Sequence, residues 1–500
     1  MKKLTKPFYP DDRRIEETAY MGPRRAGKRF WAGEYGKNPR DPEGGYPSFF
    51  TDEVFEDYKN AGLTFLMPEG DAYFEQKFTE TGLAFEPDFE KSPLYTFMKM
   101  AEKHGLDVYP ACEAIFGNMT HTDGPFGDEE KYIVRHFVET VQKYCPKSFK
   151  GIMLTDEPGI ASIGRVKKIV EYLNSDEIRA IKPDLDVFSS MLPNYATLPS
   201  YQLGYQYPDR TKQSVVFDEE RKGLYANFID ACADAVGEFS FDFYPLGEKG
   251  RLSPGFYQNL EMAAEHGRDG NFPISVTLQS FMMLYKYNHK TGRGIIIYRS
   301  PSYEDVRWQV YSSLAFGVQR LGWFTFWQHY SESEHEMFPN AMLVYDECEK
   351  SGYRKTDIYH AVAKVNREIQ AIDHVFLRFK WKGCRKIATS RDRNIRLLDG
   401  GYDGGCLRTL TGTRDTLLGC FENPEDGAEG YWLVNAHNPY WLLQNDVSVT
   451  FAGATHAVCY RNGEEQVLPL EQVTENGETC GKLSMRLSCG EGVFVIPYTE

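Results

Sequence analysis

The sequence lacks the patterns that mark membrane, exported and disulfide-bonded proteins. It has no run of about 18 apolar residues, so no membrane-spanning helix is expected. Its first ten residues are polar and contain no apolar segment, so no signal peptide is expected. The ten cysteines are scattered without a CxxC pair, which argues against a zinc site and against a disulfide framework. These features predict a cytoplasmic protein.

Positive charge is also scarce. The chain carries 57 Lys+Arg against 72 Asp+Glu, a formal net charge of −15. Such a surface repels polyphosphates, so a nucleic acid is not an expected partner. No glycine-rich loop follows a predicted strand, so the usual phosphate cradle is missing and phosphoryl transfer is disfavoured. No cofactor or metal is expected.

Aromatic residues, in contrast, are abundant. The 500 residues include 33 Phe, 32 Tyr and 7 Trp. A surplus of Tyr and Trp suits flat ligands rich in hydroxyl groups, whose apolar ring faces stack on aromatic side chains. Aromatic packing in the core of a large enzyme explains the same counts equally well.

The first three quarters of the chain alternate between short apolar runs and helix-like segments. Helix starts are indicated by Ser92-Pro93, Ser253-Pro254 and Thr356, and 128–144 has apolar residues at helical spacing. Eight strands alternating with helices predict an α/β fold of the (β/α)₈ (TIM) barrel type, with a doubly wound open sheet as the alternative. The eight predicted strands are 29–35, 63–68, 107–113, 151–157, 187–192, 239–245, 273–279 and 321–327.

After about residue 378 the pattern changes to short strand-like runs separated by Gly, Asn or Asp, such as 431–435 and 447–451. No convincing helix intervenes, which is typical of an all-β sandwich. We therefore predict a catalytic barrel over 1–378 and an accessory β-sandwich domain over 379–500. The longest irregular insertion of the barrel is 195–222, after the fifth strand, where it could shape a pocket.

Candidate functional residues are sought at the carboxyl ends of the strands, where barrels of this class place their active sites. Acids and aromatics predominate there, and glycosidic bond cleavage needs one carboxylic acid and one carboxylate on either side of the sugar. Trp31 is a further candidate for stacking on a sugar ring. The strand-end residues are Glu34, Tyr35, Glu69, Asp71, Glu113, Asp156, Glu157, Asp242, Tyr244, Gln279, Trp327 and His329.

The sharpest local signal is Asp156-Glu157-Pro158 at the end of the fourth strand. Proline disfavours the helical conformation for the residue before it, so we expect Glu157 to be extended at the rim. Alternation places Glu157 on the same face as Met153 and Thr155, toward the barrel interior. Aromatic walls and neighbouring acids would raise the pKa of Glu157, as a general acid requires.

This segment resembles clan GH-A, the large (β/α)₈ superfamily of retaining glycoside hydrolases. In that clan an Asn-Glu pair ends strand four, and its Glu is the general acid/base; Glu157 matches that Glu, while Asp156 replaces the Asn. Residues 302–317, 322–327 and 359–369 look like the last two βα units of β-galactosidase-like barrels, and the C-terminal part is similar to their accessory β-domain.

Strand seven departs from the clan, whose nucleophile there is a Glu. This sequence has Gln279, and no acid follows until Glu304. Three alternatives stay open. In the first, another carboxylate serves as the nucleophile, and Asp242 is preferred over Glu113, Glu34 and Glu334. In the second, the enzyme inverts the anomeric configuration, and a more distant carboxylate activates water. In the third, the barrel binds sugar without cleaving it.

The sequence thus predicts a glycoside hydrolase that cleaves a small oligosaccharide or glycoside. Glu157 and Asp242 are the expected catalytic pair. A non-catalytic carbohydrate-binding barrel and a metal-assisted sugar isomerase or lyase are the alternative functions, and a homo-oligomer is compatible with the sequence. The expected substrate-binding residues are Glu34, Glu113, Asp156, Tyr244, Gln279, Trp327 and His329.

Overall fold

A computed structural model gives the structure of most of the chain. The predicted first strand, with Trp31, Glu34 and Tyr35, lies outside the described residues, as do Glu69, Asp71 and Glu334. The described residues are 6–23, 49–68, 72–74, 76–79, 82–85, 88–204, 219–288, 291–331, 336–346 and 348–500.

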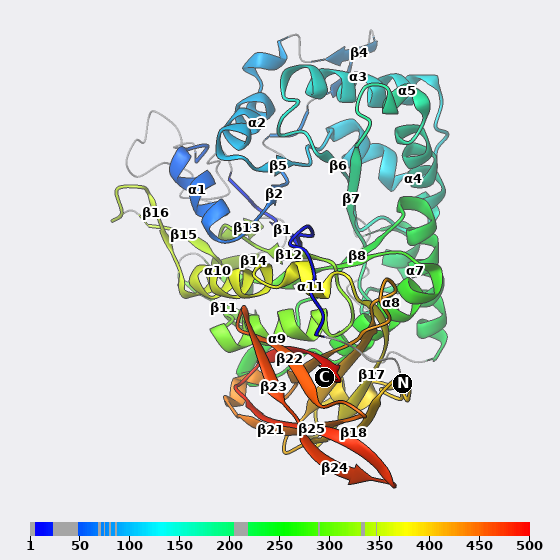
Figure 1. Cartoon of the computed structure of the whole chain (residues 1–500). Helices are drawn as coiled ribbons and strands as arrows, with labels where there is room; N and C mark the ends of the chain where they lie inside the picture. Colours follow the sequence, from blue (N-terminus) through cyan, green and yellow to red (C-terminus); the bar gives the residue numbers. More distant parts are fainter. Residues whose placement is uncertain are drawn as a thin grey trace.

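Short parallel strands alternate with helices up to residue 370, and the chain is of the mixed α/β class. Figure 1 shows the helices around the outside of these strands. The strands are β1 (Glu16–Ala19), β2 (Phe65–Leu66), β5 (Asp107–Val108), β6 (Gly151–Asp156), β7 (Asp186–Ser190), β8 (Phe239–Asp242), β9 (Ile274–Gln279) and β12 (Arg320–Phe324). The helices that follow them are α1 (Asp52–Asn60), α2 (Pro93–His104), α3 (Asp128–Tyr144), α4 (Ile160–Leu173), α7 (Glu219–Val236), α8 (Phe256–Gly270), α9 (Tyr303–Leu314) and α10 (Asp357–Gln370).

Each of these strands lies beside the next one in sequence. Parallel pairings give one sheet with the order β1-β12-β9-β8 and two smaller ones, β6-β7 and β2-β5. Backbone hydrogen bonds connect the three sheets. Met191 N–H donates to Ser240 O (2.8 Å) between β7 and β8, Lys150 N–H to Val108 O (3.1 Å) between β5 and β6, and Thr64 N–H to Glu17 O (2.8 Å) between β1 and β2.

Side chains from most of these strands converge on the guanidinium group of Arg320. It lies within 4 Å of acids from β1 and β7 and of Glu238 beside β8. Its carbon also lies 5.5–5.9 Å from the ring centres of Phe65, Tyr109 and Phe188. A cation buried in this way needs close counter-charges, so the cluster ties the amino-terminal ends of the strands together.

Three helices begin where the local sequence predicts, whereas the start of a fourth is set by a contact with a residue distant in the sequence. Ser92 and Thr356 cap α2 and α10 through their side-chain oxygens, and α3 covers the predicted 128–144. The prediction that Ser253 caps the next helix is wrong. The helix α8 begins at Phe256, and its first free N–H donates to the side chain of Asn394 (3.0 Å), more than 100 residues away in the sequence.

A four-stranded antiparallel sheet, absent from the sequence prediction, is built from insertions after β9 and β12. Its order is β11-β10-β14-β13. Its strands are β10 (Met282–Asn288), β11 (Arg293–Tyr298), β13 (His329–Ser331) and β14 (Glu336–Asn340). Because it continues from the carboxyl ends of β9 and β12, this sheet extends the same end of the molecule that carries the candidate acids.

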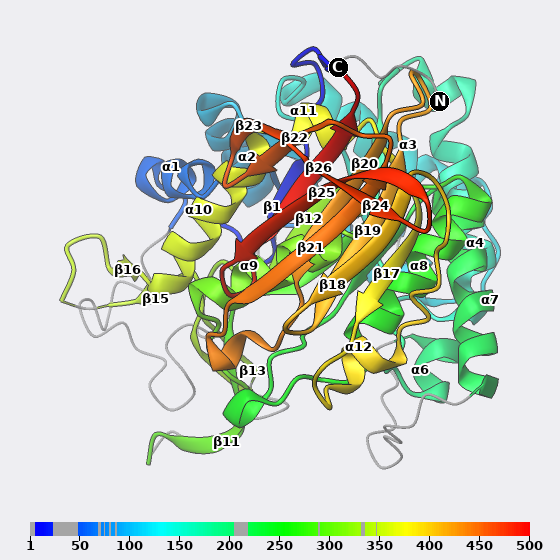
Figure 2. The same ribbon diagram turned by 60° about the horizontal axis from the view of Figure 1, so that its bottom comes forward.

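Beyond Phe379 the chain forms two antiparallel sheets, yellow to red in Figure 1 and in the foreground of Figure 2. Both contribute to one apolar cluster that includes Leu418, Leu433, Val449 and Leu483. The first sheet has β17 (Lys380–Ile387), β19 (Thr416–Glu422), β20 (Glu429–Asn435), β26 (Gly492–Tyr498), β22 (His456–Arg461) and β23 (Glu464–Pro469). The second has β18 (Leu407–Gly412), β21 (Asn445–Ala452), β25 (Glu478–Leu487) and β24 (Glu471–Glu475).

The C-terminal sheets pack closely on α9. The indole N–H of Trp308 donates to Ala436 O (3.3 Å), and the rings of Tyr311 and Trp432 lie 5.6 Å apart. At Gly419 a Cβ atom would stand 2.0 Å from Ala315 O, so only glycine permits this approach. Among the described residues, no helix is long and apolar enough to cross a membrane.

Candidate active site

Glu157 stands directly after β6, at its carboxyl end, but its backbone is not extended as expected. Its φ is +48°, in the left-handed region, which is uncommon for a residue other than glycine. Its N–H donates to Ser190 O (2.7 Å) at the end of the neighbouring strand β7. Glu157 therefore avoids the right-handed helical conformation that Pro158 disfavours by adopting a left-handed one. Such strained backbone conformations cluster at functional sites.

A close crossing of two chain segments holds this turn. The segment after Glu157 runs against the end of α6 (Leu198–Leu203), a helix in the insertion that follows β7. A Cβ atom at Gly159 would lie 2.4 Å from Gly204 N, and one at Gly204 would lie 2.9 Å from Glu157 O. The two glycines allow backbone-to-backbone contact, which fixes the position from which the Glu157 side chain projects.

Asp242 is the last residue of β8, and its carboxylate faces Glu157. Both side chains are partly exposed, although protein atoms surround the carboxyl groups closely. Burial, then the charges of Asp242 and Asp156, raise the pKa of Glu157 well above its usual value. Burial also raises the pKa of Asp242, to about 6, and hydrogen bonds from Glu157 and Tyr244 limit that rise.

These shifts favour different protonation states for the two carboxyl groups. Burial and the neighbouring acids favour the protonated form of Glu157, whereas hydrogen bonding between the two carboxyl groups favours the ionised form of Asp242. The Oδ1 atom of Asp242 is buried and accepts no hydrogen bond from any described residue. The pair therefore brings together a carboxyl group that tends to hold its proton and one that tends to lose it.

Tyrosines surround the pair. Burial and the charge of Asp242 raise the pKa of Tyr244, so its phenol stays protonated and donates to Asp242. The phenols of Tyr195 and Tyr298 also lie near enough to interact with the Asp242 charge. Behind Tyr244, the rings of Phe281 and Phe324 lie 5.0 and 5.6 Å away. These rings supply the aromatic surroundings that the composition suggested.

Gln279, the last residue of β9, does not face Glu157 and Asp242. It is 0% exposed. Its amide oxygen accepts from Leu246 N–H (2.9 Å), and its amide nitrogen donates to Phe281 O (3.1 Å) and Arg299 O (3.0 Å). The amide nitrogen and the amide oxygen of Gln279 are therefore both hydrogen-bonded to backbone groups of three different loops. The side chain holds these loops together and offers no free polar group to a substrate.

Trp327 is likewise a core residue and not a stacking surface. It is 0% exposed, with Phe49 and Tyr353 at ring distances of 4.6 and 5.3 Å. His329, on β13, is partly exposed and packs on Phe338 at 5.6 Å. Glu113 is exposed beyond the end of β5.

Among the residues that the structure describes, one group has metal-ligand chemistry: Asp11, Asp373 and His374. Arg14 already pairs with both aspartates, and Asp373 accepts from Ile15 N–H (3.0 Å) and His374 N–H (2.7 Å). Arg14 therefore supplies the positive charge that balances these two aspartates. The group also lies apart from Glu157 and Asp242 in the fold.

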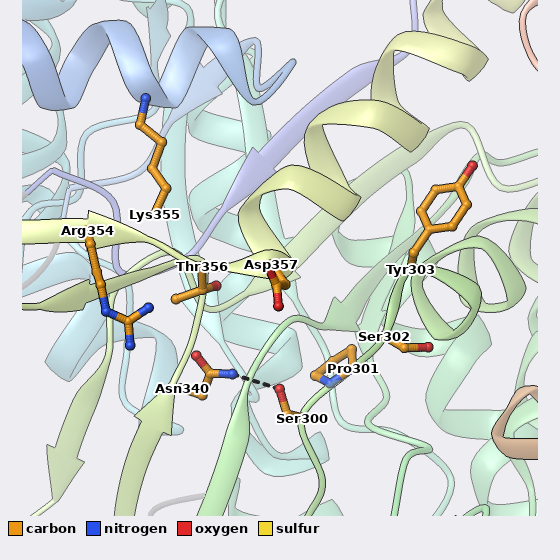
Figure 3. Close-up of a pocket in the computed structure, with 9 residues that line it drawn as sticks. All are labelled: Ser300, Pro301, Ser302, Tyr303, Asn340, Arg354, Lys355, Thr356 and Asp357. Atoms are coloured by element: carbon orange, nitrogen blue, oxygen red, sulfur yellow. Dashed lines mark hydrogen bonds between the residues drawn. The ribbon is translucent and has the colours of Figure 1, made fainter.

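A cavity of about 590 Å³ also lies away from the acid pair. Figure 3 shows it between the starts of α9 and α10, with Asn340 donating to Ser300 Oγ (2.7 Å). Lys355 points away from it toward α1, where it pairs with Asp57 (2.5 Å). Asp357 is the cavity's single carboxyl group, so the cavity cannot supply an acid and a carboxylate together.

Sequence reasoning missed Phe281 and Tyr298, because it did not predict the sheet that begins directly after Phe281 and contains Tyr298. The signal was present: 282–288 and 293–298 are aromatic and β-branched runs separated by Asn288-His-Lys-Thr-Gly292, a typical hairpin connection.

No protein-family model matches the chain, and no curated protein matches its sequence. Solved structures do resemble it. A family 5 glycoside hydrolase from Bacteroides vulgatus is 10% identical, with a TM-score of 0.47, over 99% of this chain and 90% of its own. A family 51 α-L-arabinofuranosidase from Bifidobacterium longum is 11% identical (TM-score 0.39; 97% of each chain).

A GH39 enzyme from Xanthomonas axonopodis pv. citri is 10% identical, with a TM-score of 0.39, over 90% of this chain and 92% of its own. At these identities and scores the likeness is distant. The functional argument therefore rests on the geometry of the Glu157–Asp242 pair.

Proposed function

We propose that this protein is a retaining glycoside hydrolase in which Glu157 is the general acid/base and Asp242 the nucleophile. The observation that carries the proposal is that Glu157 and Asp242 stand at the carboxyl ends of two parallel strands and interact there, with the pKa of Glu157 raised well above its usual value. Glycosidic cleavage requires such a pair of carboxyl groups in opposite protonation states.

The mechanism follows from these roles. Glu157 protonates the leaving oxygen while the carboxylate of Asp242 attacks the anomeric carbon, which gives a glycosyl ester on Asp242. Glu157, now ionised, then removes a proton from water, which attacks the anomeric carbon and releases Asp242. Tyr244 holds Asp242 ionised and oriented through its hydrogen bond.

The closeness of the two groups favours retention over inversion. Retaining enzymes hold their carboxyl groups about 5–5.5 Å apart, and inverting enzymes need about 6.5–9.5 Å to admit a water molecule. Carboxyl groups that interact directly fit the shorter of these two separations. A substrate would enter by breaking this hydrogen bond and taking the Glu157 proton itself.

We also propose that the eight parallel strands close into a (β/α)₈ barrel over 1–378, followed by a β-sandwich domain over 379–500. The hydrogen bonds between the three parallel sheets and the convergence of side chains on Arg320 support the barrel. The apolar cluster shared by the two antiparallel sheets supports the sandwich. A small oligosaccharide or glycoside remains the proposed substrate, with Asp156 and His329 as candidate contacts.

The test is hydrolysis of a panel of 4-nitrophenyl glycosides and unmodified oligosaccharides by the full-length protein. Release of reducing sugar is expected for at least one member. Glu157→Gln and Asp242→Asn should each lower kcat/KM by at least about 10³-fold. Glu464→Gln, at an exposed acid of β23, is the matched control and should retain activity. Unchanged turnover in either catalytic variant would refute the assignment, and binding without hydrolysis would favour a carbohydrate-binding barrel.

A further inference from the structure

A second cavity, of about 400 Å³, lies where the loop after β8 meets the C-terminal sheets. From the loop come Arg251, Leu252 and Pro254, and from the C-terminal part come 390–393, His437, Asn438 and Trp441. The same loop carries Tyr244 near its beginning, so it connects this cavity with the Glu157–Asp242 pair.

Trp441 distinguishes this cavity. Of the six tryptophans that the structure describes, five are at least nine-tenths buried, whereas Trp441 is 59% exposed. Tyr440, Leu442 and Leu443 beside it are exposed as well. An exposed indole at the edge of a cavity presents a flat apolar face of the kind that stacks on a sugar ring.

The turn that carries Trp441 is held firmly in place. Asn438 Nδ2 donates to Gly250 O (2.8 Å), while its side-chain oxygen accepts from Tyr440 N–H (3.1 Å). Buried Asn435 donates to Leu443 O (3.0 Å). Leu442 adopts a left-handed conformation, with φ +54°, which a leucine rarely does. Fixing exposed apolar side chains in a strained turn is a feature expected of a preorganised binding surface.

The charge around the cavity is opposite to that of the protein as a whole. Arg251, Arg391 and Arg393 are exposed, and none of them forms an ion pair with any residue that the structure describes. The lining includes one acid, Asp392, whose carboxylate is used by Asn394 N–H (2.9 Å). A chain of net charge −15 therefore has three arginines without ion pairs to described residues beside its exposed tryptophan.

We propose that this cavity binds an anionic saccharide, with Trp441 stacking on a sugar ring and Arg251, Arg391 and Arg393 binding its carboxylate or sulfate groups. Guanidinium groups bind planar carboxylates in a bidentate manner, which a neutral sugar cannot exploit. That the ligand is a saccharide rests on the proposed function. That it is anionic rests on the three arginines.

The experiment measures binding without hydrolysis, in the full-length Glu157→Gln variant. Tryptophan fluorescence and calorimetry follow titration with oligomers of galacturonate, glucuronate and mannuronate, with a sulfated oligosaccharide, and with a carboxyl-reduced neutral galacturonate oligomer. At least one anionic oligomer should bind, more weakly as salt rises, and the neutral oligomer should bind at least tenfold more weakly. Comparing the affinities of the uronate oligomers and the sulfated oligosaccharide shows whether the arginines bind carboxylate or sulfate groups of the ligand.

Trp441→Ala and the double variant Arg391→Gln/Arg393→Gln should each weaken that binding at least tenfold. Tyr132→Ala and Arg293→Gln, at exposed positions elsewhere, are the controls and should leave it unchanged. Equal affinity in Trp441→Ala, equal affinity for the neutral oligomer, or failure of every anionic oligomer to bind would overturn the proposal. A Trp441→Ala effect on self-association alone would assign the surface to protein contacts instead. Because Glu157→Gln serves for all titrations, these outcomes do not depend on whether the wild-type protein hydrolyses anything.

Discussion

At the scale of single residues, the different states of Glu157 and Asp242 predict how activity depends on pH. Activity should fall at low pH as Asp242, whose pKa is about 6, becomes protonated, and at high pH as Glu157 loses its proton. Tyr244→Phe removes a hydrogen bond that lowers the pKa of Asp242, so the acidic limb of the kcat/KM profile should move upward by about one pH unit. An acidic limb that does not move would show that Tyr244 does not act on Asp242.

The raised pKa of Glu157 also has a cost in stability. In the folded state this carboxyl binds its proton more tightly than in the unfolded chain, so its contribution to the free energy of unfolding decreases as pH rises above about 4.5. Glu157→Gln has no proton to lose and should gain stability relative to the wild type between pH 4.5 and 7, by about 1–3 kcal/mol. Urea unfolding at the two pH values measures this, with Glu113→Gln as control. A variant that loses relative stability with rising pH would contradict the pKa shift.

At the scale of secondary-structure elements, Gln279 holds three loops together through its amide. Gln279→Glu replaces the NH₂ group with an oxygen opposite the carbonyl oxygens of Phe281 and Arg299. The variant places a carboxyl group at the end of β9, yet it should lose about 2–4 kcal/mol of stability and gain no activity. Thermal and urea unfolding test this, with exposed Gln466→Glu as control. Higher activity in Gln279→Glu would show that position 279 reaches the substrate.

The same scale shows what sequence could and could not predict. Strands such as β6 and β9 are readable because every position except the last of β6 is buried, which gives continuous apolar runs. The strand β1 was missed because it begins with two acids; Glu16 pairs with Arg320, and Glu17 is buried against Gln370. The cap of α8 by Asn394 and the orientation of Gln279 depend on partners distant in the chain. The position of Glu157 and Asp242, the proposed catalytic acids, at strand ends could be predicted, whereas the conformation of Glu157 depends on a neighbouring loop.

At the scale of the whole molecule, the C-terminal sheets and the α/β part share one apolar core, which includes Trp308, Phe316, Trp381 and Trp432. Gly419→Ala places a methyl group against the carbonyl of Ala315 and should destabilise the protein by about 1–3 kcal/mol. Gly164→Ala, in α4 with open space around it, is the control and should be neutral or slightly stabilising. Because the core is shared, the variant's unfolding should remain a single transition. A separate early transition of the C-terminal sheets would contradict this account.

The central claim is that Asp242 attacks the sugar while Glu157 protonates the leaving group. The most direct measurement is trapping with 2,4-dinitrophenyl 2-deoxy-2-fluoroglycosides of the sugars that the panel identifies, followed by mass spectrometry of the intact protein and its peptides. The account predicts one glycosyl adduct, on Asp242, absent from Asp242→Asn. An adduct on another carboxylate, or hydrolysis that yields the inverted anomer with no adduct, would contradict it.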